Sequence, residues 1–374
     1  MKWPGDVAKN SPQKVGRRQF LWQALVSGGL ISSYLKGQLA NGQQNTALRP
    51  GTPASASTGT SNELFTPNID FFIRNHFSIP KIDADAWTLE IVGLVSKPAK
   101  LSYGDLLLMS SVRGPSTIEC AGNRSGGGGV GTAAWSGVPL ADLLKQAGVR
   151  PGASTVVFHG ADSGDVEGLP PGTHYARGIP LEKALDPATL LAYEMNGEPL
   201  PADHGFPARA LVPGWYGMDS VKWLTRVEIL DKPFIGYFQQ EEYMSVRANG
   251  DRRPVTRMLV NSKFLRPSAG EEIRVKTYKV EGAAWAGERK VGKVEVRVSP
   301  GESWQTASLG ATPVAMVWTP WSYDWKVPGS GHYVLEVRAT DEDGNTQPDV
   351  RDPDRKDAYE LNTPARVSVV SVGS

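Results

Sequence analysis

This sequence contains few cysteines and histidines, and its net charge is close to zero. One cysteine and five histidines occur in 374 residues, so an intramolecular disulfide is excluded and no zinc-binding spacing is present. Forty basic and thirty-nine acidic side chains leave a net charge of +1. Nucleic acid is therefore not expected as a main partner, because no positive excess is available to neutralise phosphates. The motifs CxxC, HExxH, GxSxG and the phosphate-binding P-loop are also absent.

Long apolar runs are lacking too. Residues 25–39 form an apolar stretch near the N-terminus, but its glycines and serines make it too short and too weakly apolar for a stable membrane span. It follows GRRQFL (16–21), whose paired arginines resemble those of twin-arginine export signals. We predict an export signal over 1–40, a periplasmic location, and a flexible linker over the polar, Pro- and Gly-rich residues 41–62. An uncleaved amphipathic arm is the alternative interpretation.

Residues 63–254 combine strand and helix patterns. The alternation of apolar and polar residues that is typical of half-buried strands occurs at 87–92, and strands are also predicted at 155–159 and 221–229. Ser102 followed by Asp105 is typical of a helix start. A second helix is predicted from Pro139 to the residue before Gly148. This region is therefore predicted to be a mixed α/β domain.

Residues 255–374 have a different pattern. Three segments alternate with a period of two, at 273–280, 294–298 and 333–338, and turn residues separate them. No helical periodicity is visible in this region. We predict an all-β, immunoglobulin-like sandwich without the paired cysteines of antibody domains, which gives an α+β protein overall.

The cysteine lies in an unusual segment, TIECAGNRSGGGG (117–129). Arg124 close to Cys120 favours the thiolate, which is the form that binds a metal or acts as a nucleophile. Consecutive glycines let backbone N–H groups approach an anionic ligand. An inert buried thiol is the alternative. Glycines 126, 128 and 131 match GxGxxG, but the preceding strand and following helix of a dinucleotide site are missing from the pattern.

Three further segments are polar in a way that a core does not explain. They are FIRNH (72–76), DHGFPAR (203–209) and GWYGMDSVK (214–222). Arg209 and Lys222 are natural phosphate partners, since arginine offers a fork of donors and lysine a point charge.

Seven stretches together resemble the sulfite oxidase family. FFIRNHFSIP, TIECAGNR, LLAYEMNGEPLPADHGFPAR and VPGWYGMDSVKW follow the order of that family's molybdenum-cofactor domain. GxxWAG (282–287), VEVRVSPGESWQTA and VWTPW resemble its C-terminal dimerisation domain. The resemblance covers residues 63–350.

The resemblance implies a molybdenum–molybdopterin cofactor with Cys120 as the protein ligand of the metal, which suits a soft thiolate. Residues at catalytic positions around the substrate anion would be Arg74, His76, Arg124 and Tyr243, together with Cys120. The pterin and its phosphate would be held by Phe72, Ile73, Arg74, Asn75, His76, Asp162, His204, Arg209, Ser220, Val221 and Lys222.

The implied activity is oxidation of sulfite to sulfate by a homodimer. The chain contains no haem-attachment CxxCH, so an external acceptor, a c-type cytochrome, is expected to take the electrons. Relatives often carry an arginine in the Trp-rich C-terminal segment, whereas this chain reads WTPW (318–321); Arg247, Arg351 and Arg355 are candidate substitutes. Alternatives are a sulfane-sulfur dehydrogenase or sulfoxide reductase with the same cofactor, and a molybdenum-free exported binding protein.

Overall fold

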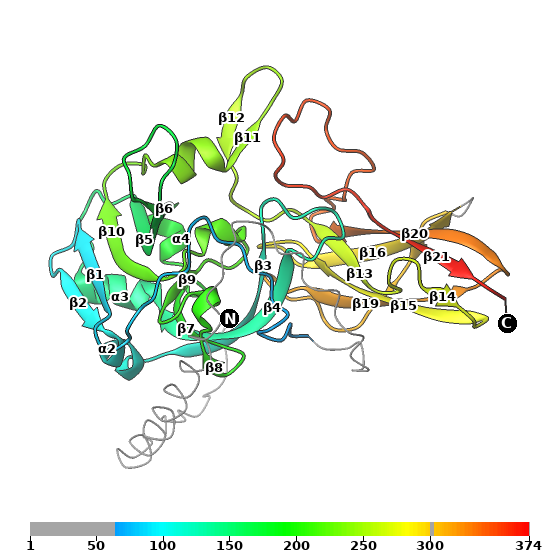
Figure 1. Ribbon diagram of the computed structural model, residues 1–374, viewed down its shortest axis with the longest axis horizontal. Coiled ribbons are helices and arrows are strands. Elements are labelled where there is room, and N and C mark those ends of the chain that lie inside the picture. Colours follow the sequence, from blue (N-terminus) through cyan, green and yellow to red (C-terminus); the bar gives the residue numbers. More distant parts are fainter. Residues whose placement is uncertain (1–63, 300–302, 374) are drawn as a thin grey trace, which may run out of the picture. The chain divides into compact units, whose positions relative to one another are not determined.

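The computed structural model describes residues 64–299 and 303–373, which belong to one compact unit (Figure 1). The predicted export signal (1–40) and linker (41–62) lie outside these residues. Within the described ranges, no helix has both the length and the hydrophobicity needed to cross a bilayer.

The region that precedes residue 254 contains two larger sheets. The first has the strand order β2-β1-β10-β5-β6 and is antiparallel except for the β1–β10 pair. Its strands are β1 (Thr88–Gly93), β2 (Ala99–Ser102), β5 (Thr155–Gly164), β6 (Thr173–Pro180) and β10 (Leu224–Leu230). The second has the order β3-β4-β7-β8, with β9 paired to β7. Its strands are β3 (Val112–Glu119), β4 (Val130–Pro139), β7 (Leu190–Met195), β8 (Glu198–Pro199) and β9 (Arg209–Leu211).

Short helices connect these strands, as the sequence predicted. Helix α2 (Tyr103–Leu108) begins with a capping box in which the Ser102 hydroxyl accepts from the Asp105 N–H and the Asp105 carboxylate accepts from the Ser102 N–H. Helix α3 (Leu140–Ala147) ends at Gly148, whose φ of 66° is the left-handed conformation that glycine adopts without strain. A further helix, α4, spans Leu181–Ala184.

The predicted strand 221–229 starts later than its pattern indicated. Trp223 has a φ of 52°, a left-handed conformation that cannot continue a strand. The regular ladder therefore begins at Leu224, and the residues just before it are free to turn their side chains elsewhere.

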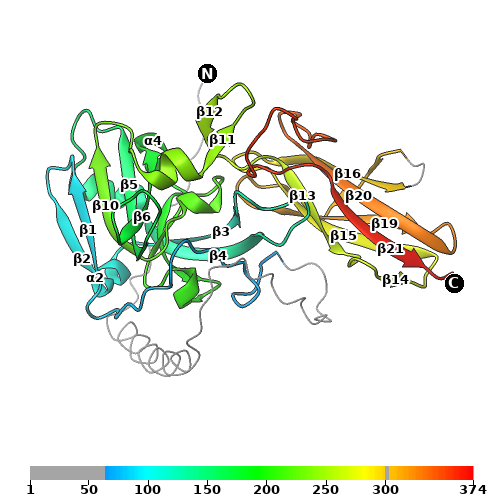
Figure 2. The same cartoon turned by 45° about the horizontal axis from the view of Figure 1, so that its top comes forward.

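The C-terminal region is built from two sheets, as predicted (Figures 1 and 2). One has the order β13-β15-β19-β18, with strands β13 (Asn261–Arg266), β15 (Thr277–Trp285), β18 (Ser308–Leu309) and β19 (Thr319–Lys326). The other has the order β14-β21-β20-β16-β17, with strands β14 (Glu272–Ile273), β16 (Val291–Ser299), β17 (Gln305–Thr306), β20 (Gly331–Asp341) and β21 (Ala365–Ser371). Both contribute to one apolar core that includes the fully buried Trp321, Trp325 and Leu335. The immunoglobulin-like topology remains a prediction.

The predicted continuous strand 273–280 is wrong. Ile273 pairs with Ser371 in the five-stranded sheet, whereas Tyr278 pairs with Trp325 in the four-stranded sheet. The chain crosses from one sheet to the other over residues 274–276, and both flanking apolar residues reach the shared core. Alternation alone does not distinguish one strand from two strands that face the same core from opposite sides.

A separate cluster of buried residues joins the two regions. It consists of Ala121, Val130, Tyr216, Met218, Tyr243, Val255, Met258, Ala283, Trp285 and Trp318. Polar contacts accompany it: the Thr117 N–H donates to the Met316 carbonyl at 2.9 Å, and the Thr117 hydroxyl accepts from the Trp318 N–H at 2.7 Å. The end of strand β3 is thus held by the C-terminal region.

Candidate active site

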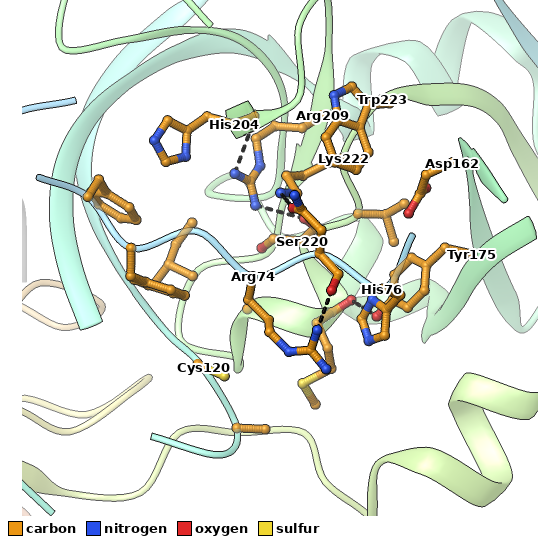
Figure 3. A pocket seen from close by; sticks show the side chains of 18 of the residues that line it. Arg74, His76, Cys120, Asp162, Tyr175, His204, Arg209, Ser220, Lys222 and Trp223 are labelled. Atoms are coloured by element: carbon orange, nitrogen blue, oxygen red, sulfur yellow. Dashed lines mark hydrogen bonds between the residues drawn. The ribbon is translucent and has the colours of Figure 1, made fainter. Parts of the chain in front are cut away.

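Most of the predicted site residues line one cavity, although they come from widely separated segments (Figure 3). Residues 72–76 lie in an irregular segment before β1, and Cys120 directly follows β3. Further contributions come from the 3₁₀ helices η1 (Ala202–His204) and η2 (Gly217–Asp219). Tyr243 also lines the cavity; it follows the π-helix η3 (Phe238–Glu242) and precedes the short β11–β12 pair (Met244–Val246 and Arg252–Pro254). The predicted residues that line the cavity are Phe72, Arg74, Asn75, His76, Cys120, Asp162, His204, Arg209, Ser220, Val221, Lys222 and Tyr243.

Two predicted site residues do not line the cavity. The side chain of Ile73 points out and is 40% exposed. Arg124 is exposed as well, since it lies in a turn closed by the Gly127 N–H, which donates to the Arg124 carbonyl at 2.7 Å. The cation that acts on the thiol is Arg74: burial raises the pKa of Cys120, while the Gly122 N–H and the Arg74 charge oppose that rise.

One end of the cavity carries two cations, Arg209 and Lys222. Arg209 is buried and donates to the carbonyls of His204 (3.1 Å) and Ser220 (2.8 Å). Lys222 donates to the Asp203 carbonyl at 2.7 Å and to the Asn75 side chain. Among the described residues, neither cation forms an ion pair with a carboxylate. Burial lowers the pKa of both, that of Lys222 to about 7. An anion bound there would offset the cost of burying this charge.

Asp162 lies on the same side of the cavity. Its side chain is 4% exposed, and its Oδ1 lacks a hydrogen-bond partner within the described part of the chain. Burial raises the pKa of this carboxyl to about 6, with Lys222 opposing. A buried acceptor without a donor is costly, so this position fits a ligand that carries N–H donors.

The Cys120 end of the cavity is lined by an imidazole and a phenol in direct contact. His76 Nε2 lies 2.6 Å from the Tyr243 hydroxyl, and the His76 ring stacks on Tyr175 at 4.2 Å. Burial, together with the charges of Arg74 and Lys222, lowers the pKa of His76 to about 3. Burial also raises the pKa of Tyr243 above its ordinary value. Both groups are therefore neutral near pH 7, and Arg74 supplies the positive charge beside Cys120.

A buried ion pair behind the cavity was missed from the sequence. Arg177 on β6 donates its Nε–H to Asp219 Oδ1 at 2.8 Å and also donates to the Phe238 carbonyl; both charged side chains are fully buried. Burial raises the pKa of Asp219 to about 6, and the charge of Arg177 opposes that rise. Asp219 lies within the singled-out segment 214–222, but Arg177 carries no recognisable motif. The cavity-lining residues Phe71, Tyr175 and Trp223 were also missed.

The three arginines considered as substitutes form ion pairs elsewhere. Arg247 pairs with Asp352 at 3.0 Å. Arg351 and Arg355 both pair with Asp357, at 3.2 and 2.8 Å. These arginines do not line the cavity, so none of the three adds a positive charge to its lining.

Comparisons with known proteins identify the family. A family model described as an oxidoreductase molybdopterin binding domain matches residues 76–238, and one described as a Mo-co oxidoreductase dimerisation domain matches residues 252–355. Mitochondrial sulfite oxidase of Homo sapiens is 35% identical over 326 residues, which cover 78% of this chain. The chain belongs to the sulfite oxidase family. It spans 59% of the length of the human relative.

Other similar proteins have names that indicate different activities. The nitrate reductase [NAD(P)H] of Hordeum vulgare is 34% identical over 337 residues, covering 77% of this chain and 37% of that protein. The crystal structure of the sulfane dehydrogenase SoxCD from Paracoccus pantotrophus superposes with a TM-score of 0.75 at 25% identity, covering 98% of this chain and 92% of that one. The fold is therefore shared by enzymes that act on different substrates.

The family match confirms the predicted molybdenum–molybdopterin cofactor, and the cavity residues fit it. Cys120 would ligate the metal as a thiolate. Asp162 Oδ1, which has no hydrogen-bond partner within the part of the chain that the structure describes, would accept from the N–H donors of the pterin. Arg209 and Lys222, which lack acidic partners among the described residues, would hold the phosphate.

Proposed function

We propose that this chain is a molybdenum-dependent sulfite dehydrogenase. Sulfite would be oxidised to sulfate, and the electrons would pass to an external acceptor, a c-type cytochrome. We further propose a periplasmic location, which the paired arginines at 17–18 support. The dimerisation-domain match supports a homodimer, with an immunoglobulin-like sandwich as the associating domain.

The observation that carries this proposal is the group of side chains beside Cys120. Arg74, neutral His76 and neutral Tyr243 line the same cavity as the thiol. When bound, the cofactor supplies oxygen-atom transfer and holds two electrons. Arg74 attracts an oxyanion and orients it through charge-assisted hydrogen bonds. Tyr243 and His76, which share one hydrogen bond, keep a neutral donor next to that anion without titrating near pH 7.

A sulfane-sulfur substrate is the second candidate. It is supported by the fold shared with the sulfane dehydrogenase along 98% of this chain. It is also supported by the three arginines considered as substitutes, since Arg247, Arg351 and Arg355 are paired outside the cavity. A site with less positive charge discriminates less strongly in favour of a small dianion.

Sulfite-dependent reduction of cytochrome c by the purified protein, normalised to its measured molybdenum, tests the proposal. A thiol-bound sulfane is assayed in parallel by the same reduction of cytochrome c, and nitrate and a sulfoxide are assayed as oxidants of a reduced viologen dye. Turnover with sulfite in proportion to molybdenum would support it. Molybdenum-loaded protein that turns over the sulfane and not sulfite would favour the second candidate. Purified protein without molybdenum would favour a non-enzymatic binding protein.

A further inference from the structure

The residue before Cys120 is a buried carboxylate that accepts hydrogen bonds on both oxygens and has no role in the proposed chemistry. Glu119 ends strand β3 and is 1% exposed. Its Oε1 accepts from Asn123 Nδ2 at 3.0 Å and from Asn261 Nδ2 at 3.1 Å. Its Oε2 accepts from Trp285 Nε1 at 2.8 Å. Asn123 belongs to the Cys120 loop, whereas Asn261 and Trp285 belong to the C-terminal region.

The orientation of each donor is fixed by its other contacts. Asn123 Oδ1 accepts from the Gly129 N–H at 2.9 Å, so its Nδ2 must face Glu119. Asn261 Oδ1 accepts from the Ser262 N–H at 2.9 Å, which orients its Nδ2 in the same way. The Trp285 indole nitrogen is a donor only. Three fixed donors therefore converge on two oxygens, and a carboxylate is the side-chain group of this size whose two ends both accept.

These contacts reach the backbone that carries the thiol. The Asn123 N–H donates to the Cys120 carbonyl, and the Cys120 N–H donates to the Gly129 carbonyl, both at 2.8 Å. Glu119 thus connects to both ends of the Cys120 loop through Asn123. The same loop is also held from outside, since the Glu360 N–H donates to the Ala121 carbonyl at 3.0 Å.

We propose that Glu119 is a positioning residue that fixes the Cys120 loop against the C-terminal domain and so sets the orientation of the thiolate toward molybdenum. The inference rests on the proposed role of Cys120 as metal ligand. What it adds is that two residues of the C-terminal domain, Asn261 and Trp285, help to position the metal-ligating Cys120, although neither lines the cavity.

The substitution Glu119→Gln tests this most directly because it preserves size. Gln supplies one acceptor oxygen, which can keep the two asparagines, and one NH₂, which would then face the Trp285 N–H donor. Two opposed donors in a buried site disfavour the closed loop. Local opening of the loop should become roughly tenfold more frequent. Combining the change with Trp285→Phe removes the opposing donor and should largely cancel the effect.

Hydrogen exchange of the full-length, molybdenum-containing protein measures loop opening without requiring turnover. Peptides covering 120–130 should exchange roughly tenfold faster in E119Q than in the wild type, with peptides of β16 unchanged. In a W285F background, adding E119Q should change loop exchange by less than about twofold. Glu336→Gln, a buried glutamate of β20 that is 4% exposed, is the matched control and should leave the loop unchanged.

The absorption band that arises from thiolate-to-molybdenum charge transfer links the loop to the metal. It should shift in E119Q and remain in place in E336Q. The inference would be overturned if the loop of E119Q exchanged at the wild-type rate. It would also be overturned if E119Q accelerated loop exchange equally with Trp285 and with Phe at position 285, or if loop exchange accelerated while the absorption band stayed in place. Absence of sulfite turnover in the wild type would instead count against the proposed substrate, since neither measurement depends on it.

Discussion

Removal of one partner of the buried Arg177–Asp219 pair should destabilise the protein strongly. Both side chains are fully buried, with Asp219 Oδ1 2.8 Å from Arg177 Nε and 2.7 Å from Nη2. Asp219→Ala leaves a guanidinium in the interior without its counter-charge. Breaking a buried pair in this way costs about 3–5 kcal/mol. Replacing both residues together, Arg177→Met with Asp219→Leu, removes the stranded charge and should recover most of that loss.

Urea unfolding followed by tryptophan fluorescence measures the effect. With a urea dependence of about 3 kcal/mol per molar, the upper end of the usual range, the midpoint should fall by about 1 M or more in D219A. Asp352→Ala is the matched control, because Asp352 pairs with Arg247 at a similar distance of 3.0 Å but at the surface, with exposures of 42% and 49%. Its unfolding free energy should change by about 0.5 kcal/mol or less.

If D219A lost no more stability than the surface control, the buried pair would not carry the cost assigned to it. If the double replacement cost as much as the sum of the single ones, the stranded charge would not be the cause. A second consequence concerns the cavity. Arg177 also donates to the Phe238 carbonyl in the π-helix that precedes Tyr243, so D219A should lower kcat for the preferred substrate as well as stability.

Three further predictions concern the cavity itself. Cys120→Ser should abolish turnover and lower molybdenum content while far-ultraviolet circular dichroism stays unchanged; retained turnover would remove Cys120 as metal ligand. Arg74→Gln should raise KM for sulfite by roughly tenfold or more through loss of a charged contact worth about 1.5–3 kcal/mol, whereas Arg124→Gln, on a side chain that does not line the cavity, should leave KM unchanged. His76 has a folded-state pKa of about 3, below its ordinary value of about 6.5, so the unfolded chain binds more protons between these values. The contribution of neutral His76 to the free energy of unfolding is complete above about pH 6.5 and should fall by about 2 kcal/mol at pH 5. His76→Gln should therefore flatten the measured dependence of the unfolding free energy on pH. An unchanged slope would contradict a lowered pKa of His76.

Local signals predicted the local structure well. The capping box at Ser102 and the left-handed Gly148 appear at the expected helix ends, because each depends on a few neighbouring residues. The resemblance to the sulfite oxidase family also named most of the residues that line the cavity. These residues lie in segments whose polar composition a core would not tolerate, which is why they could be recognised.

What the sequence could not provide was long-range geometry. Arg124 is close to Cys120 along the chain, yet the turn at Gly127 carries its side chain to the surface, and Arg74 takes the position beside the thiol instead. Arg177 shows no motif because its role depends on Asp219, forty-two positions later. The crossing between sheets at residues 274–276 was hidden because both strands present apolar residues to one shared core.

The buried cluster that joins the two regions constrains how members of this family can exchange parts. Trp285 and Trp318 of the C-terminal region pack with Ala121 and Tyr243 of the catalytic region. A chimera that fused residues 64–254 to another member's C-terminal domain would have to carry matching residues at both tryptophan positions and at Asn261. Across the family, the residue at the position of Glu119 should therefore vary together with the residues at 261 and 285. The two domains are then expected to evolve together at these contacting positions.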